Sequence, residues 1–191
     1  RSVPTADAER HRVRQVNSPR YNPIERGWFP WGNSTWRDIR TYGTYAYVVT
    51  ESTAGFQIID LSNPNNPTQV GFFGTNISNS AHNVCVDLGT GTLYLVGSNA
   101  GTPAWDLTSN PANPSYIGLA GGTGNNNYFH DLCVENGYGY GSMIYNGVAR
   151  IWDMSTFPPS TLSNSATPNN FTHNAWPNAA GTVMVTTDEQ S

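Results

Sequence analysis

The sequence predicts an all-β protein, a β-propeller whose blades are four-stranded antiparallel sheets. Three observations predict it: a composition rich in turn formers, a motif that returns about every 45 residues, and no extended helical periodicity. Of the 191 residues, 19 are Gly and 13 are Pro, and aromatic residues reach 12%. Charged residues make up only 12%, against roughly 25% in an ordinary soluble domain. Such a composition favours short strands joined by many turns.

The repeating motif is an apolar run that ends in Asp and leads into a turn rich in Ser or Thr, Asn and Pro. Asp60, Asp106 and Asp153 mark successive copies, separated by 46 and 47 residues. Asp and Ser satisfy free backbone amides of the turn, while Pro fixes φ and ends the strand. An earlier short run precedes the motif in each copy; these runs span residues 46–50, 93–97 and 139–143. Such a period, with about four short strands, is typical of a propeller blade.

The repeat divides most of the chain into blades. We expect three of them at approximately 33–80, 81–128 and 129–171, with a partial blade at 172–191. A closed propeller needs at least about four blades, so three to four predict an incomplete ring or a fragment of a longer propeller. A β-sandwich is the alternative all-β architecture, but it does not require one motif to return three times in register.

Residues 1–32 do not match the repeat and are expected to form a basic arm. All nine basic residues are Arg, and eight of them lie within the first 40 residues. Beyond residue 40 the chain has nine acidic residues and a single basic residue, Arg150. An acidic body argues against nucleic-acid binding, which needs a basic face. The segment 21–31, rich in Pro and aromatic residues, is predicted to pack on a neighbouring surface, and the arm offers a route to assembly.

A second series of polar residues returns at another phase of the repeat, just before the strand that opens each unit. Its members are Asp38, His82, His130 and His173, with spacings of 44, 48 and 43 residues. The innermost strand of a blade lies beside the central channel, so equivalent positions of successive blades point toward one axis. We therefore predict that these side chains converge at the mouth of the channel.

Converging imidazole and carboxylate groups favour a divalent cation such as Zn²⁺, Mn²⁺ or Fe²⁺, with Ca²⁺ preferred if oxygen ligands dominate. Asp131 lies beside the series, and Asp188 or Glu189, at the end of the last strand, can add ligands. Glu51 ends the corresponding strand of the first unit. Two alternatives stay open: the same side chains could hydrogen-bond backbone groups and lock the blades together, or they could perform acid–base catalysis.

The two cysteines, Cys85 and Cys133, each follow a histidine of this series by three residues. Equivalent positions of adjacent blades lie beyond the roughly 7 Å that a disulfide can span, so we expect free, buried thiols. Neither cysteine has the CxxC spacing of a thiolate metal site.

Several stretches together carry a family resemblance; they are residues 34–51, 58–64, 81–83, 94–99, 129–131, 171–176 and 186–189. At these residues the sequence resembles the choice-of-anchor B family of secreted or surface β-propellers with LVIVD-type repeats. The resemblance implies an extracellular domain joined to a surface anchor, and no particular enzymatic reaction. Two departures matter: family members continue beyond the Asp-Glu motif at 188–189, and they carry a further blade where residues 1–32 stand here.

We expect, from all of this, a secreted or cell-surface module that binds protein or glycan, with a divalent metal at the central channel. Sequons at Asn33, Asn76 and Asn170 are compatible with secretion. The competing function is a metal-dependent hydrolase or lyase that uses the His/Asp ring. A nucleophile elbow, a phosphate-binding loop and paired carboxylates at fixed spacing are all missing from the sequence, which disfavours an enzyme. No apolar run approaches the roughly 18 residues of a membrane span.

Overall fold

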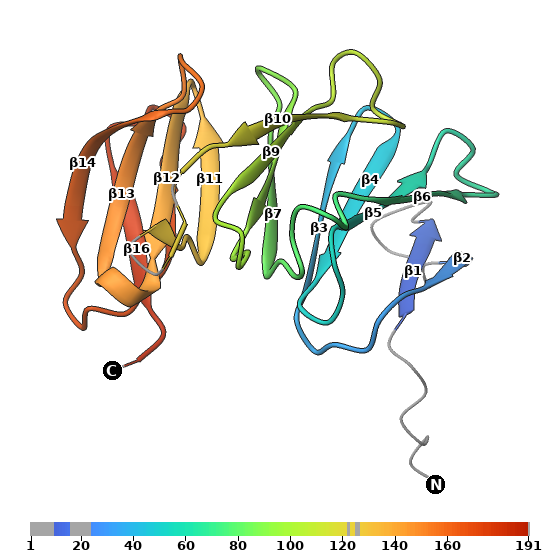
Figure 1. The fold of residues 1–191 in the computed structure, drawn as a ribbon, viewed down its shortest axis with the longest axis horizontal. Coiled ribbons are helices and arrows are strands. Elements are labelled where there is room, and N and C mark those ends of the chain that lie inside the picture. Colours follow the sequence, from blue (N-terminus) through green and yellow to red (C-terminus); the bar gives the residue numbers. More distant parts are fainter. Residues whose placement is uncertain (1–9, 16–23, 122, 125–126, 191) are drawn as a thin grey trace, which may run out of the picture.

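The computed structural model describes residues 10–15, 24–121, 123–124 and 127–190, with residues 10–15 described by their backbone alone. The described residues form sixteen strands and the short 3₁₀ turn η2 (Ile144–Asn146), and they contain no α-helix (Figure 1). The all-β fold class predicted from the sequence is confirmed. No helix in the described ranges is long and apolar enough to cross a membrane.

Three antiparallel sheets of four strands form the body, and in each the strands follow one another in chain order. The first sheet contains β3 (Arg37–Tyr42), β4 (Tyr45–Thr50), β5 (Phe56–Asp60) and β6 (Thr68–Phe73). The second contains β7 (Asn83–Asp87), β8 (Thr92–Val96), β9 (Pro103–Asp106) and β10 (Ser115–Leu119). The third contains β11 (Asp131–Glu135), β12 (Tyr138–Met143), β13 (Val148–Asp153) and β14 (Ser160–Ala166).

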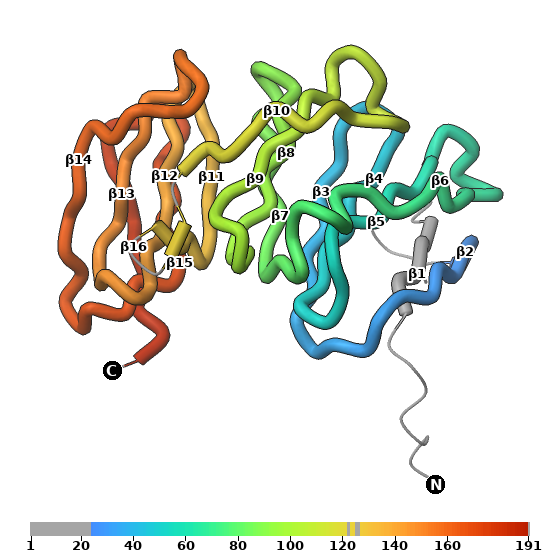
Figure 2. The backbone as a smooth tube through the Cα atoms, in the orientation of Figure 1, coloured from blue at the N-terminus to red at the C-terminus, as the bar shows by residue number. Residues whose placement is uncertain are grey.

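Two smaller sheets flank this body. The hairpin of β1 (Arg10–Gln15) and β2 (Ile24–Pro30) precedes the first sheet, and the pair β15 (Thr172–Pro177) and β16 (Met184–Asp188) follows the third. The first strands of successive sheets, β3, β7, β11 and β15, contact one another in that order and form an inner wall. β2 and the last sheet lie at opposite ends of the row (Figures 1 and 2). The arrangement fits an incomplete propeller.

The motif aspartates hold equivalent places, as the repeat predicts. Each is the last residue of the third strand of its sheet, and each accepts a hydrogen bond from the backbone N–H two residues further on. These bonds are Asp60–Ser62 at 2.7 Å, Asp106–Thr108 at 2.8 Å and Asp153–Ser155 at 2.9 Å. The short polar side chain therefore closes the turn that the following Pro then fixes.

Apolar cores lie between neighbouring sheets. Between the first and second sheets, Trp105 packs edge-on against Phe56, with ring centroids 5.0 Å apart. Between the second and third, Trp152 packs with Phe129, with centroids 4.3 Å apart. Both tryptophans directly precede a motif aspartate, so one short stretch of sequence sets both the strand end and the packing residue. Burying an aromatic side chain of this size stabilises the fold by about 2–3 kcal/mol.

The arm expected over residues 1–32 lies partly outside the described residues, which include only 10–15 and 24–32 of it. Phe29 of β2 is buried against Val48 and Ile59 of the first sheet. The ring of Trp31 lies 5.3 Å from that of Phe72. This part of the chain therefore packs on the face of the first sheet that is turned away from the second.

Candidate metal centre

Three histidines lie in a row at one end of the inner wall. His82 directly precedes β7, His130 directly precedes β11, and His173 is the second residue of β15. The ring centroids of His82 and His130 are 4.4 Å apart, and those of His130 and His173 are 4.1 Å apart. Three separate sheets thus bring their histidines together, because each inner strand begins at the same level.

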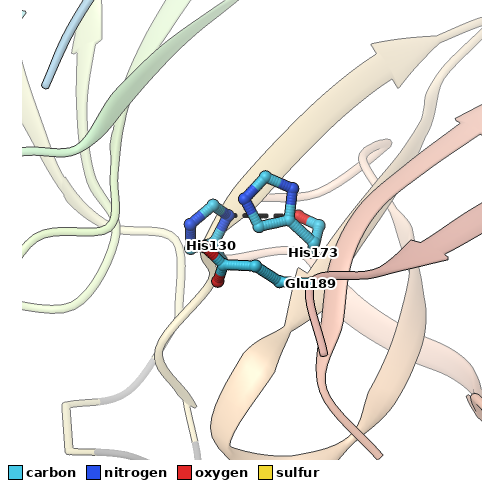
Figure 3. A group of neighbouring side chains, drawn as sticks. All are labelled: His130, His173 and Glu189. Atoms are coloured by element: carbon cyan, nitrogen blue, oxygen red, sulfur yellow. Dashed lines mark hydrogen bonds between the residues drawn. The ribbon is translucent and has the colours of Figure 1, made fainter. Parts of the chain in front are cut away.

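His130, His173 and Glu189 form the compact part of this row. Each offers one ligand atom, and these atoms all lie within 4.8 Å of one another (Figure 3). Glu189 directly follows β16, the strand paired with β15, and its backbone N–H donates to the carbonyl of Phe171, two residues before His173. His130 is buried, His173 is partly buried and Glu189 is exposed, so the cluster opens to solvent on the carboxylate side.

Neighbouring acceptors fix the tautomer of both imidazoles. The Nδ1–H of His130 donates to the backbone carbonyl of His173 at 3.1 Å, and the Nδ1–H of His173 donates to Oδ1 of Asn174 at 2.6 Å. The amide of Asn174 is itself oriented, because its Nδ2 donates to Oδ2 of Asp131 at 2.5 Å. Since each Nδ1 carries the proton, each Nε2 keeps its lone pair for a ligand.

The surroundings keep His130 neutral. Burial first, and then the neighbouring His82 and His173 rings, lower the pKa of its imidazole to about 4, although the His173 carbonyl and Asp131 act in the opposite direction. The neutral imidazole that results at neutral pH is the form that binds a metal ion.

Two imidazoles and one carboxylate are a ligand set that Zn²⁺ uses in open, four-coordinate sites. With three protein ligands, one position would remain for water or for an oxygen of a bound molecule. Mn²⁺ and Fe²⁺ accept the same donor types, whereas Ca²⁺ prefers oxygen ligands alone. The donor set therefore favours a transition metal over Ca²⁺.

His82 adjoins the cluster without belonging to the set of three. Its Nδ1 lies 2.5 Å from Oε1 of Glu51, which directly follows β4. Glu51 and Glu189 hold the same position in their sheets, because β3–β4 and β15–β16 pair in matching register. The row of three imidazoles therefore has a carboxylate at each end.

The predicted series assumed that Asp38 holds the same position in its sheet as the histidines hold in theirs, but the strand register shows that it does not. Strand register places Asp38 with Asn83 and Asp131, while Arg37 takes the place of the histidines in the first sheet. The spacing alone could not decide whether Arg37 or Asp38 is equivalent to the histidines, because the units differ in length by several residues.

The Asp/Asn position just after the histidines links one sheet to the next. Oδ2 of Asp38 accepts the backbone N–H of Val84 at 3.2 Å, and Nδ2 of Asn83 donates to the carbonyl of His130 at 2.8 Å. Asp131 continues the pattern through Asn174. The contacts at this position match the alternative in which these side chains hydrogen-bond neighbouring sheets and hold the blades together. Asp38 and Asp131 therefore lie outside the three-residue cluster.

Asp188 also lies outside the cluster, although it is next to Glu189. Its Oδ1 accepts the hydroxyl of Thr167 at 2.6 Å, and its oxygens accept the backbone N–H groups of Asn169 and Phe171 at 3.0 and 3.2 Å. These hydrogen bonds, the Thr167 hydroxyl first, lower the pKa of Asp188. Its role is therefore to hold the loop that enters β15.

Sequence reasoning missed Asn174 and Arg37. Both could have been found by aligning the units on the dipeptide that opens each inner strand, Arg-Asp, His-Asn, His-Asp and His-Asn, rather than on single charged residues. Such an alignment assigns the first residue of each pair to the row and the second to the sheet-to-sheet link.

A separate cavity of about 370 Å³ lies along the inner strands at the end opposite the histidines. Arg40, Cys85, Cys133 and Trp176 are among its lining residues. Both thiols are free and buried, as predicted. Burial raises the pKa of both, that of Cys133 to about 11.

Comparison with known families gives one match, to the LVIVD repeat, over residues 35–75. The matched residues contain the whole of the first sheet, β3 to β6. No curated protein matches the chain. The LVIVD repeat is a propeller repeat, so the match and the architecture agree, and together they indicate a propeller-like binding or structural module.

Proposed function

We propose that this protein is an extracellular propeller-type binding module, of the choice-of-anchor B kind, that holds a transition-metal ion between its third and last sheets. His130, His173 and Glu189 would be the protein ligands, and the open position would receive an oxygen of a protein or glycan ligand. The LVIVD match supports the repeat family, and the motifs that continue beyond residue 75 carry the resemblance to choice-of-anchor B proteins. The observation that carries the metal is the convergence of three ligand atoms within 4.8 Å, with both imidazole tautomers already fixed.

The test measures Zn²⁺ binding to the purified chain after treatment with a chelator. We expect one Zn²⁺ per chain by competition with a chromophoric chelator, and a loss of at least about 100-fold in affinity for His130→Ala and Glu189→Gln. Glu51→Gln is the matched control, because Glu51 holds the same register position but lies outside the cluster. That variant should bind Zn²⁺ with nearly unchanged affinity.

Binding should also stabilise the fold, because the complete ligand set exists only in the folded state. At 100 times Kd the added stability is about 2.7 kcal/mol, enough to raise the melting temperature by several degrees. Chelator should remove this increase in the unaltered chain and have no effect on His130→Ala. Equal losses of affinity in Glu51→Gln and Glu189→Gln, or no response to Zn²⁺ in the unaltered chain, would contradict the proposal.

One observation favours a second candidate, a metal-dependent hydrolase. Three protein ligands and an open position also describe catalytic zinc sites, in which the bound water becomes the nucleophile. Zn²⁺-loaded protein and Glu189→Gln should be assayed side by side on ester, peptide and phosphoester substrates. Turnover that depends on Glu189 would favour the hydrolase over the binding module. Equal background rates in both proteins would favour the binding module.

The proposed extracellular location rests on the resemblance to surface propellers, and the sequons are compatible with it. Asn33, Asn76 and Asn170 are all exposed, so each could carry a glycan without entering a core. Brief protease treatment of intact source cells should degrade the protein or release it if it is displayed outside. Full protection in intact cells, with cleavage after lysis, would place it inside instead.

A further inference from the structure

A groove of about 370 Å³ lies between the end of the second sheet and the outer strands of the third. One wall is the segment that leaves β10, where Gly121 is small enough to leave room beside the ring of Trp152. The other wall consists of Arg150 and Trp152 of β13 and of Thr161 of β14. Both sheets are complete, and the groove shares no residue with the histidine row. It is therefore a second, separate place where a ligand could bind.

Arg150 gives this groove a positive charge that the protein does not neutralise. It is the one basic residue after residue 40, where nine acidic residues are found. Even so, it makes no ion pair with a carboxylate of the described residues, whereas Arg40 pairs with Asp38 at 2.7 Å. Burial alone lowers the pKa of Arg150. A partly buried guanidinium without an opposite charge beside it costs free energy, which an anion in the groove would offset.

Neutral groups hold this guanidinium in place without using all of its donors. Its Nε donates to Oδ1 of Asn164 at 2.8 Å, and its Nη1 donates to Oδ1 of Asn127 at 3.5 Å. Its Cζ lies 5.9 Å from the centre of the Phe129 ring, within the range of a cation–π contact. Among the described residues, no group accepts a hydrogen bond from Nη2. The edge formed by Nη1 and Nη2 is therefore held in position and still able to bind two oxygen atoms.

We propose that this groove binds the carboxylate group of a small organic acid, with Arg150 as its charged partner. A carboxylate is planar and presents two oxygens at the spacing of a guanidinium edge. One carboxylate neutralises the single positive charge, whereas a doubly charged sulfate or phosphate would bring a second negative charge into an acidic body. The Thr161 hydroxyl and the apolar side chains of Leu119 and Pro159 provide polar and apolar contacts for the remainder of such a ligand.

The carboxylate can belong to an acidic sugar or to an acylated amino acid, and the chemistry at Arg150 is the same for both. The experiment therefore titrates the chelator-treated full chain with D-glucuronate and with N-acetylglycinate, and follows the ¹H–¹⁵N NMR signals of the Arg150 Nε–H and the Trp152 indole. D-glucose and N-acetylglycinamide are the uncharged counterparts. We expect saturable shifts with at least one acid and at least about 10-fold weaker binding of its counterpart, because hydrogen bonds between charged groups are the stronger ones. The acid that binds more tightly identifies the source of the carboxylate.

Matched variants locate the binding. Arg150→Gln should weaken the binding of that acid at least about 10-fold. Arg40→Gln removes the same charge from a residue that is already paired and that lines the other cavity, so it should change the affinity by less than about 2-fold.

A second pair of variants leaves the arginine in place. Thr161→Glu puts a carboxylate of the chain itself into the groove, and it should weaken the binding of the acid at least about 10-fold, because the guanidinium is then occupied and a like charge repels the ligand. Thr161→Gln has the same size without the charge and should bind within about 3-fold of the unaltered chain, since neutral surface changes have small effects.

The proposal would be overturned if neither acid gave a saturable shift, or if an acid and its uncharged counterpart bound equally well. Equal losses in Arg150→Gln and Arg40→Gln, or tighter binding of sulfate than of both acids, would contradict it as well. His130→Ala should bind the acid with unchanged affinity. A failure of the metal site and a failure of this groove are therefore distinguishable.

Discussion

At the scale of single residues, the site depends on side chains that never need to touch a metal. Asn174 connects Asp131 to His173 and so decides which imidazole nitrogen carries the proton. The carbonyl of His173 does the same for His130. A charge-neutral amide between a carboxylate and an imidazole orients the ring through its two hydrogen bonds.

Replacing Asn174 with Ala should lower Zn²⁺ affinity by about 10- to 100-fold, the usual effect of removing a partner that orients a ligand. The measurement is competition with a chromophoric chelator. Asn113→Ala, in an exposed turn of the second sheet, should bind as the unaltered chain does. An unchanged affinity in Asn174→Ala would show that the amide does not position the ring.

Cys85 and Cys133 should react slowly with alkylating reagents in the native protein. Burial raises the pKa of both thiols, so the thiolate that reacts is scarce at pH 8, and access is poor as well. Intact mass should show no more than slow modification under native conditions and two adducts in denaturant. A disulfide, seen as missing adducts after denaturation without reductant, would contradict the predicted free thiols.

At the scale of strands and sheets, small residues decide how closely an inner strand approaches its neighbours. A Cβ added at Gly141 of β12 would overlap the ring of Phe129, which directly precedes His130. The aromatic core between the second and third sheets and His130 of the candidate metal centre are thus coupled through one glycine. Gly71 of β6, by contrast, has its nearest neighbour at 3.5 Å, an ordinary contact.

Gly141→Ala should destabilise the protein by about 1–3 kcal/mol, the cost of overpacking a well-filled core, and should also weaken Zn²⁺ binding by displacing His130. Gly71→Ala, a strand glycine with room for the methyl group, should change stability by less than about 0.5 kcal/mol. Thermal denaturation of both variants, with and without Zn²⁺, makes the comparison. Equal melting temperatures would mean that Phe129 has room to move.

The turn after β9 should give the stability a specific pH dependence. Hydrogen bonds from Thr108 and Ser109 lower the pKa of Asp106 below its ordinary value of 3.8. A lowered folded-state pKa contributes stability above the unfolded-state value, and this contribution is lost as pH falls through the folded-state value. Asp106→Asn should therefore melt lower than the unaltered chain at pH 7, and the gap should narrow below about pH 3.8. A difference in melting temperature that stays constant with pH would mean that the substitution acts through packing and not through the charge of Asp106.

At the scale of the whole molecule, the sequence predicted the residues that recur in every unit, and it did not predict contacts that occur in one unit alone. The spacing of Asp60, Asp106 and Asp153 was enough to place equivalent turns, because each motif encodes its own turn chemistry. The three histidines were found for the same reason. Glu189 lies in the three-residue cluster, whereas Asp188 is held by contacts with Thr167 and the loop before β15, and the repeat period does not encode these contacts. The sequence did not reveal that β1 and β2 pair with the same register shift as the outer two strands of the complete sheets, because Gln15 stands where the other units have Asp.

The strand order within the sheets also bears on how the chain folds. Because every complete sheet is a meander of consecutive strands, most pairings close only short loops, and among the described residues the extensive contacts between sheets join sheets that follow one another in the chain. Stability is then close to a sum of local units and the interfaces between them, as in other repeat proteins. Trp105 and Trp152 sit in two different interfaces, so Trp105→Phe and Trp152→Phe variants should report different urea midpoints by fluorescence, whereas coincident midpoints would mean that the chain unfolds as one unit. With folding organised in this way, each complete sheet can form as soon as its own four strands have left the ribosome.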